Sequence, residues 1–190
     1  MTKEQLITEL STRRISKNEV DRLASSIVND PSLVPTVLKR VFEEDGTDYF
    51  NAAWVFDNAM RRNLRLLLPH VDMFISGLPS LRSESTIRPM AHVCELLTVA
   101  YFKKKDALFK KSLSDKDLEQ LVTVCFDWLI GKHKVAAKVF AMTSLFYLGE
   151  KFDWVHAELK LVLEQTMANG TTGYKNRAQK TLHKLRALEN

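Results

Sequence analysis

Asp57 is the residue whose surroundings in the sequence most resemble those of a reactive group. It follows Trp54 by three positions, so on a helix it shares the apolar stripe that begins at Phe50. Partial burial in such a stripe favours the protonated carboxyl, which could then serve as an acid or a base. Arg61 lies four positions further on, at the spacing of an ordinary helix ion pair. The sequence therefore favours a structural role for Asp57, as a partner of Arg61 or of a neighbouring helix end.

The other chemistry-bearing residues do not show the spacings that catalysis or metal binding requires. The histidines and cysteines have neither the HxxxH spacing nor a zinc-ligand pattern. A glycine-rich phosphate loop and a nucleophile elbow are also missing from the sequence. We therefore expect no catalytic residue, no metal site and no cofactor. The histidines concerned are His70, His92, His133, His156 and His183.

The composition is typical of a folded globular protein. Hydrophobic residues make up 45% and charged residues 27% of the 190 residues, which disfavours a disordered chain or a coiled-coil rod. The net charge of +5 permits an acidic partner without requiring one. Cys94 and Cys125 lie in apolar runs and are expected to be buried and reduced. The N-terminus lacks a signal-peptide core and no apolar run reaches about 18 residues, so we expect a cytoplasmic protein with no membrane contact.

Apolar residues recur every three or four positions, and only 6 Gly and 5 Pro interrupt the chain, so the sequence predicts an all-α fold. Ser16 with Glu19 has the spacing of a capping box, and Ser114 can begin a helix. Thr47 or Asp48 can begin a long helix that Pro69 stops. The predicted helices cover residues 3–11, 16–29, 32–43, 47–68, 69–77, 85–103, 106–111, 114–131, 134–148, 152–169 and 174–188. No flexible linker separates them, so we expect a single domain, residues 1–190.

Four of these helices share a loose pattern that suggests an internal repeat. They begin at Phe50, Ile87, Val135 and Lys175, at spacings of 37, 48 and 40 residues, and each follows another apolar helix across a turn. Periods of about 40–47 residues are typical of HEAT-like helical hairpins. The helix from Val135 is apolar on nearly every side, which predicts a central, buried position. The sequence therefore predicts a right-handed HEAT/armadillo-like α-α superhelix of paired antiparallel helices, with an ordinary helical bundle as the alternative.

Several blocks of the sequence resemble a family of short bacterial proteins of about this length. The blocks are Phe126–Ile130, Lys134–Gly149, Phe152–Trp154 with Glu158–Lys160, and the segment IRPMAHVCELL that begins at Ile87. Members of this family look like HEAT-type α-solenoids and often carry the name adenylosuccinate lyase. The resemblance covers nearly the whole chain, and it implies the fold far more than an activity.

The name adenylosuccinate lyase implies a chemistry that can be compared with this sequence. Enzymes of that superfamily are more than twice this length and carry a mobile loop resembling S-S-x-M-P-x-K-x-N-P with a catalytic serine. The nearest serine clusters here, Ser25 with Ser26 and Ser83 with Ser85, lack the Met-Pro-Lys-Asn context. No catalytic residue is therefore carried over, and we expect a protein that is not an enzyme. Lyase activity stays a third alternative through the name alone.

Trp54 with Asp57 is also similar to an arrangement in HEAT-like DNA glycosylases that excise alkylated bases. Those enzymes hold the lesion on aromatic platforms and use an aspartate to stabilise the sugar cation. Asp127-Trp128 and Asp153-Trp154 are two further pairs. Adjacent residues point about 100° apart on a helix, so each pair predicts a buried ring beside a solvated or capping acid, with Asp153 as a cap. A nucleic-acid-binding protein related to these glycosylases is the alternative hypothesis for function.

Polar stripes on the four repeated helices are the broadest indication of function. If the helices stack, these stripes align into one concave, mostly basic surface that suits an acidic protein segment or a phosphate backbone. A solvated face without a partner is the alternative, and the lysines at 103–105 and 110–111 are expected to be exposed loop charge. The stripes are Asn51, Asn58, Arg62 and Arg65; Arg88, His92 and Glu95; Lys134 and Lys138; and Asn176, Lys180 and His183.

We therefore expect a non-catalytic adaptor or scaffold that binds an acidic protein partner through this basic surface, with nucleic acid as the alternative partner. Binding energy at such surfaces comes from a few arginine or aromatic anchors. The expected binding residues are Arg62, Arg65, Arg88, His92, Lys138, Trp54 and Asp57.

Overall fold

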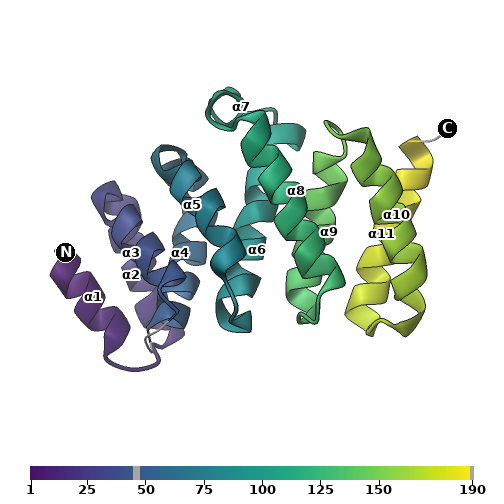
Figure 1. Ribbon diagram of the computed structural model, residues 1–190. Helices are drawn as coiled ribbons and strands as arrows, with labels where there is room; N and C mark the ends of the chain where they lie inside the picture. Colours follow the sequence, from purple (N-terminus) through teal and green to yellow (C-terminus); the bar gives the residue numbers. More distant parts are fainter. Residues whose placement is uncertain (45–47, 189–190) are drawn as a thin grey trace. The chain divides into compact units, whose positions relative to one another are not determined.

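The computed structural model describes residues 1–44 and 48–188, and all regular structure in these residues is helical (Figure 1). The prediction of an all-α fold is therefore confirmed. The α-helices are α1 (Lys3–Ser11), α2 (Lys17–Asn29), α3 (Val34–Phe42), α4 (Tyr49–Arg62), α5 (Val71–Gly77), α6 (Glu84–Thr98), α7 (Ala107–Ser112), α8 (Asp115–Ile130), α9 (Val135–Leu148), α10 (Asp153–Thr166) and α11 (Thr172–Leu188). Short 3-10 segments are η1 (Pro31–Leu33), η2 (Leu64–His70), η3 (Leu78–Ser80) and η5 (Met167–Asn169), and η4 (Val99–Lys103) is a π-helical turn.

The chain divides into two compact units, an N-terminal unit from Met1 to Val93 and a C-terminal unit from Cys94 to Asn190. The boundary falls inside α6. In the N-terminal unit, α4 packs against α2 and α3, and α1 packs against α3 and α4. In the C-terminal unit, α9 packs against α8, α10 and α11. Consecutive helices joined by short turns run antiparallel within each unit, as Figure 1 shows for α8 and α9, so the predicted helix pairing is confirmed. That all 190 residues behave as one domain stays a prediction.

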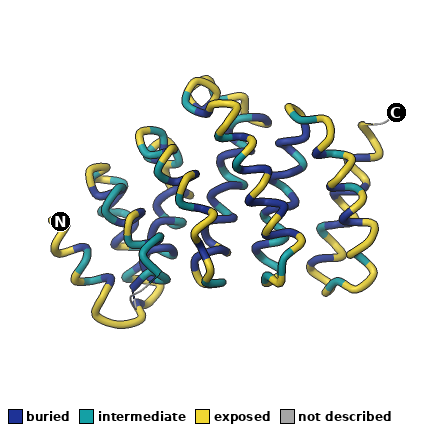
Figure 2. The backbone as a smooth tube through the Cα atoms, viewed as in Figure 1, coloured by how far each residue is buried: buried dark blue, intermediate teal, exposed yellow. Residues whose placement is uncertain are grey.

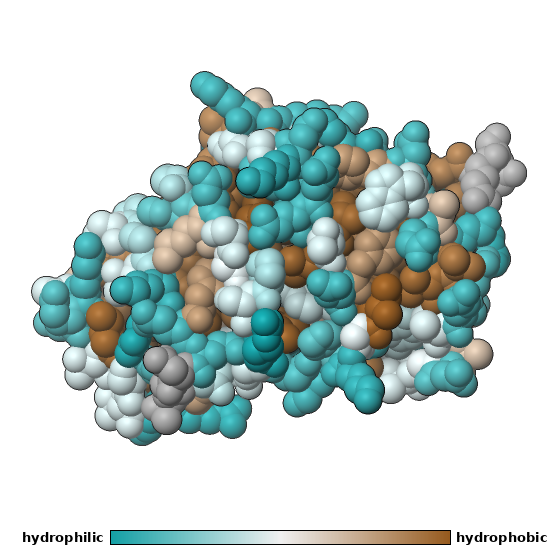
Figure 3. Space-filling model, in the orientation of Figure 1, coloured by the Kyte–Doolittle hydropathy of each residue, from teal (hydrophilic) through white to brown (hydrophobic). Residues whose placement is uncertain are grey.

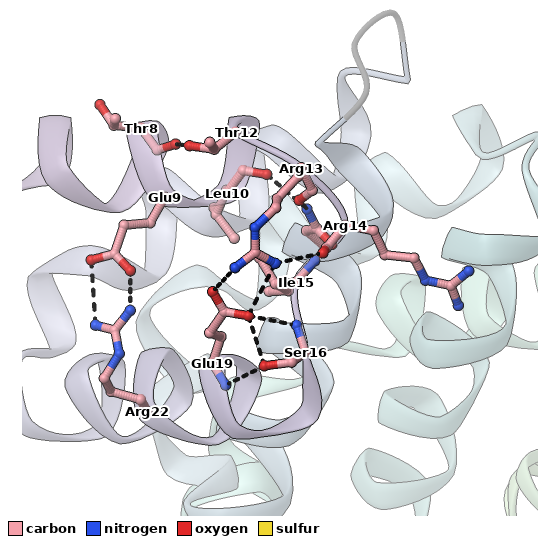
Figure 4. A network of polar contacts seen from close by, with 11 residues as sticks. Thr8, Glu9, Leu10, Thr12, Arg13, Arg14, Ile15, Ser16, Glu19 and Arg22 are labelled. Carbon is pink, nitrogen blue, oxygen red and sulfur yellow. Dashed lines mark hydrogen bonds and ion pairs between the residues drawn. The ribbon is translucent and has the colours of Figure 1, made fainter.

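Helix starts follow the predicted capping chemistry. The Ser16 hydroxyl accepts a hydrogen bond from the Glu19 N–H (3.4 Å), and the Glu19 carboxylate accepts one from the Ser16 N–H (2.7 Å; Figure 4). The same reciprocal arrangement joins Ser114 to Asp117 at the start of α8, which ends at Gly131 as predicted. Both boxes satisfy N–H groups that the first turn of a helix leaves without an internal partner. These two starts could be placed from the sequence because their partners are three residues apart.

The helix predicted to run to Leu68 ends instead at Arg62. Asn63 breaks it, because the Asn63 side-chain oxygen accepts a hydrogen bond from the Arg65 N–H (3.2 Å) and begins η2. Asp48 is the N-cap residue of α4, but its side chain makes no capping bond there. The Asp48 carboxylate instead binds Arg40 at 2.8 Å. The alternative cap, Thr47, lies outside the described residues.

The helical run that starts with α6 begins one residue before the predicted Ser85 and ends, through η4, at Lys103 as predicted. It begins at Glu84, where the Glu44 carboxylate accepts hydrogen bonds from the N–H groups of Arg82 (2.8 Å) and Ser83 (3.1 Å). At its C-terminus the helix widens into η4 after Thr98. Lys105 then adopts a left-handed conformation (φ 52°), a common way for a helix to end.

The core of the C-terminal unit is built around α9, as predicted. Ala137 and Ala141 are fully buried, and small side chains at these positions let the neighbouring helices approach closely. Buried positions line the facing sides of paired helices in both units (Figure 2). Cys94 and Cys125 are free and buried, as expected, and burial raises the pKa of the Cys94 thiol.

Candidate interaction surface

In the N-terminal unit, Asp57 of α4 and His92 of α6 form a close pair. His92 Nδ1 lies 2.6 Å from Asp57 Oδ1, and the two side chains are 20% and 13% exposed, respectively. The structure therefore pairs Asp57 with His92 instead of Arg61, which corrects the predicted helix ion pair. Two partly buried polar groups that satisfy each other across two helices make a cross-link between α4 and α6.

Arg62 joins α4 to α2. Its guanidinium donates to the Asp21 backbone carbonyl (2.9 Å) and to the Ser25 hydroxyl, and it forms an ion pair with the Asp21 carboxylate (2.8 Å). A guanidinium holds its donors in a rigid fork, so three contacts to one turn of α2 orient the side chain. Arg62, which was predicted to bind a partner, therefore already makes its contacts within the N-terminal unit.

The prediction of one exposed polar face along the helix from Phe50 is wrong. Asn51 is only 1% exposed, and its side chain bonds the turn between α1 and α2. Asn58 is half-buried and donates to the Trp54 carbonyl at 2.9 Å. Arg65 lies in η2 and does not continue α4. Helical spacing alone does not reveal which polar positions the neighbouring helices cover.

The remaining predicted binding residues are distributed over both units. Trp54 is half-buried on α4, and Arg88 is exposed on α6, one turn before His92. Lys138 is half-buried on α9, in the C-terminal unit. Among the predicted binding residues, Asp57 and His92 contact each other through their side chains. That any of these side chains binds a partner stays a prediction.

Helix α11 of the C-terminal unit carries basic charge that no acidic residue of the same helix balances. Its buried side follows the helical period, and its other positions hold five basic residues and no acidic one. The chain has 28 basic and 23 acidic residues, so the rest of it holds 23 of each. The formal net charge of +5 is therefore equal to that of α11 alone. The five basic residues are Lys175, Arg177, Lys180, Lys184 and Arg186.

A hollow of about 530 Å³ lies between α9 and α11. The described residues that line it include three cations and a histidine, and no carboxylate is among them. The predicted stripe of Asn176, Lys180 and His183 lines this hollow in full. The complete lining is Thr143, Phe146, Asn176, Arg177, Gln179, Lys180, Thr181, His183 and Lys184.

Arg177 is oriented by contacts to two elements of the C-terminal unit. Its Nη1 donates to the Thr143 hydroxyl of α9 at 2.6 Å and lies 3.6 Å from the Glu95 carboxylate of α6. The first contact is a direct hydrogen bond, whereas the second is longer than the 2.7–2.9 Å typical of a charge-assisted hydrogen bond. The guanidinium is therefore positioned at the hollow without being fully neutralised there.

Phe146 forms an aromatic wall of the same hollow. Lys184 Nζ lies 5.3 Å from the centre of its ring, within the range of a cation–π contact. His156 packs behind, with ring centres 5.7 Å apart, and its Nε2 lies 2.7 Å from the Phe146 carbonyl oxygen. The wall is thus held by α10 as well as by its own helix.

A second hollow, in the N-terminal unit, has a different electrostatic character. It lies between α1, α3 and α5, and its lining includes two glutamates and three cations. Arg40 and Lys39 form ion pairs with Glu43 at 3.0 and 3.7 Å. Opposite charges that neutralise each other give such a surface little preference for an anion. The α9–α11 hollow is the better candidate for an acidic ligand.

Hydrophobic side chains reach the surface of the C-terminal unit over α8 and α10 (Figure 3). Ile130 is 61% and Trp154 58% exposed, and the Trp154 ring stacks on Phe126 with centres 6.0 Å apart. The expectation of a buried ring is therefore confirmed for Trp128 and wrong for Trp154. Asp153 is the first residue of α10 and not its cap, because Phe152 occupies the N-cap position.

Sequence reasoning missed Arg177, Lys184, Thr143 and Phe146 as parts of one surface. Thr143 and Phe146 lie on the helix expected to be a buried core element, and only the packing of α11 shows that they line a hollow. The five basic residues of α11, with no acidic residue among them, were a signal that could have drawn attention to the first two.

Within residues 1–44 and 48–188, no cluster of His, Cys, Asp and Glu could hold a metal ion. In the same part of the chain, every helix is too short or too polar to cross a bilayer. Residues 6–185 match the profile of a protein family described as a HEAT repeat domain. No curated protein and no solved structure matches the chain, so no named relative supports the label adenylosuccinate lyase.

Proposed function

The chain belongs to the HEAT repeat domain family, and we propose that it is a non-catalytic adaptor that binds an acidic segment of a protein partner. Helical repeats of this kind present the same face of successive helices as an extended binding surface. The single observation that carries the proposal is the charge of α11, which equals the net charge of the whole chain.

Ion pairs hold the charge of α11 less closely than they hold several other cations of the described residues. Short ion pairs hold Arg40 to Asp48, Arg62 to Asp21 and Lys151 to Asp115, all at 2.6–2.8 Å. Two ion pairs of α11, from Arg177 to Glu95 and from Arg186 to Glu164, measure 3.6 Å each. Longer pairs neutralise less of the field that a basic helix presents to an acidic partner.

An acidic protein segment fits this surface better than a nucleic acid does. Proteins that hold single strands stack successive bases on several aromatic side chains. Phe146 is the one aromatic residue in the lining of the α9–α11 hollow, and Lys184 lies over its ring. The other lining groups are hydroxyls, amides and cations, which are suited to carboxylates and to peptide backbone.

The proposal includes Arg62, Arg65, Arg88 and Lys138 as further anchors, together with Trp54, Asp57 and His92. Because Arg62 and Asp57 already serve as links between helices, we expect their replacement to act mainly on stability. Location in a reducing cytoplasm belongs to the same proposal, and the two free, buried cysteines support it.

Affinity capture with matched charge reversals tests this function. The α11 variant carries Lys175→Glu, Lys180→Glu and Lys184→Glu, and the control carries Lys103→Glu, Lys104→Glu and Lys105→Glu. Both sets change the charge equally, so a general loss of positive charge affects them alike. We expect one acidic partner to be captured by the wild type and the control and lost by the α11 variant.

Retention of the same partner by the α11 variant would contradict the proposal. Binding to duplex or single-stranded DNA provides the second readout. Affinity for DNA that is measurable at low salt, falls steeply as salt rises and weakens on Arg65→Ala would favour the nucleic-acid alternative instead.

A further inference from the structure

We infer that the hollow between α9 and α11 binds a short extended peptide segment with acidic side chains at alternate positions. This inference rests on the proposed function and narrows it to one site and one partner chemistry. It concerns residues of the C-terminal unit alone.

The three cations of the hollow form a ladder along α11. Arg177, Lys180 and Lys184 are separated by three and four positions, so they share one face of the helix. At about 1.5 Å per residue, Lys180 and Lys184 are offset by about 6 Å, and the ladder is about 10 Å long. Side chains at alternate positions of an extended segment lie about 7 Å apart on one side. Two such carboxylates match the ladder closely enough for flexible lysine side chains to reach both.

The Arg177 end of the ladder is prepared for a carboxylate. Both of its described contacts, to Thr143 and Glu95, are made by Nη1. The guanidinium has further N–H donors on Nη2 and Nε, and two of them can bind one carboxylate side by side. The hydrogen bond to the Thr143 hydroxyl already restricts the Arg177 side chain. Binding of a carboxylate therefore costs less conformational entropy.

The Lys184 end combines a charge with an apolar wall. Its ammonium group lies over the Phe146 ring and keeps N–H donors for an anion. The exposed part of Phe146 offers apolar surface to a side chain that lies between the acidic positions of the segment. Contacts of His156 with Phe146 keep this wall in place.

The hollow has a size that suits a segment of a few residues. A volume of about 530 Å³ falls within the 300–1,000 Å³ typical of ligand pockets, which is too small for a folded domain. The amide side chains of Asn176 and Gln179 can donate to and accept from a peptide backbone at its edge. We therefore expect recognition of an extended tail or loop of the partner.

Fluorescence anisotropy with a labelled peptide that carries glutamates at alternate positions tests this inference. The site variant is Lys180→Gln with Lys184→Gln, and the matched control is Lys175→Gln with Arg186→Gln. The control removes the same charge from the same helix but from residues outside the hollow. We expect the site variant to weaken binding about tenfold or more, and the control to weaken it less than about threefold. Equal unfolding midpoints establish that both variants are folded.

Four outcomes overturn the inference. Equal weakening by both variants would show general attraction to α11, which leaves the proposed function standing. Equal binding of a peptide with glutamines in place of the glutamates would remove the requirement for carboxylates. Absence of peptide binding at low salt would exclude an extended segment with alternate acidic side chains as the ligand. The affinity-capture experiment would still test the proposed function independently. Tighter binding of a thymidine oligonucleotide, lost in the site variant, would assign the hollow to nucleic acid.

Discussion

Replacing Asn51 by alanine removes a buried polar link between α4 and the turn that joins α1 to α2. The Asn51 amide nitrogen donates to the Leu10 carbonyl (2.8 Å) and the Arg13 carbonyl (2.7 Å), and its oxygen accepts from the Ile15 N–H (3.2 Å). The turn is also held by the pairs between Arg13 and Glu19 and between Glu9 and Arg22 that Figure 4 shows, but those are more exposed.

The size of the effect follows from these three hydrogen bonds. Each contributes about 1 kcal/mol net, and backbone groups left without a partner at a buried site add to the loss. We therefore expect Asn51→Ala to lower the free energy of unfolding by about 2–4 kcal/mol. That is a large fraction of the 5–15 kcal/mol typical of a folded domain. Asn51→Asp should cost at least as much, because a carboxylate would face two carbonyl oxygens.

Urea unfolding followed by circular dichroism measures this difference, and Asn58→Ala is the matched control. Asn58 is a half-buried asparagine of the same helix whose side chain makes one local bond, to the Trp54 carbonyl. Its replacement should cost less than about 1 kcal/mol. If Asn51→Ala costs no more than Asn58→Ala, the reasoning about the buried link is wrong.

Three further predictions concern a helix start, a pH dependence and the thiols. Glu44→Ala should lower the free energy of unfolding by about 1–2 kcal/mol, since its carboxylate caps α6, and chemical denaturation with no loss would refute this. The Ser16 hydroxyl is the main cause that lowers the pKa of Glu19 from 4.5 to about 2. The ionised Glu19 carboxylate should therefore stabilise α2 fully above pH 4.5, and this stabilisation should be lost as the pH falls through about 2. An NMR titration that gives the Glu19 carboxyl a pKa near 4.5 would contradict this. Cys94 and Cys125 should resist a thiol reagent in the folded protein and react in denaturant, because both are buried; rapid reaction without denaturant would show that they are accessible.

Much of the local structure could be predicted from the sequence. The capping boxes at Ser16 and Ser114 depend on partners three residues apart, and the central position of α9 follows from a helix that is apolar on nearly all sides. The pairing of consecutive helices follows from short turns between amphipathic segments. These features depend on contacts between residues that are close in the chain. The spacing of polar and apolar residues in the sequence therefore predicts them.

The candidate site depended on tertiary structure to a greater degree. Asp57 pairs with His92 across 35 positions, and Arg62 pairs with Asp21 across 41. Helical spacing had suggested Arg61 as the partner of Asp57 and an exposed binding stripe for Arg62. Asn51 looked like part of an exposed stripe until the turn after α1 covered it. The position of a residue in the helical repeat indicates which face of the helix its side chain occupies. It does not indicate which residue of another helix that side chain contacts.

The sequence by itself determined that this chain forms paired helices and that residues 172–188 hold five basic residues and no acidic one. Only the packing of α11 against α9 decided that Arg177, Lys180 and Lys184 share a hollow with Phe146. The physical reason is that helix formation follows from local backbone bonding and hydrophobic period, whereas a concave surface arises where two helices fail to fill the space between them.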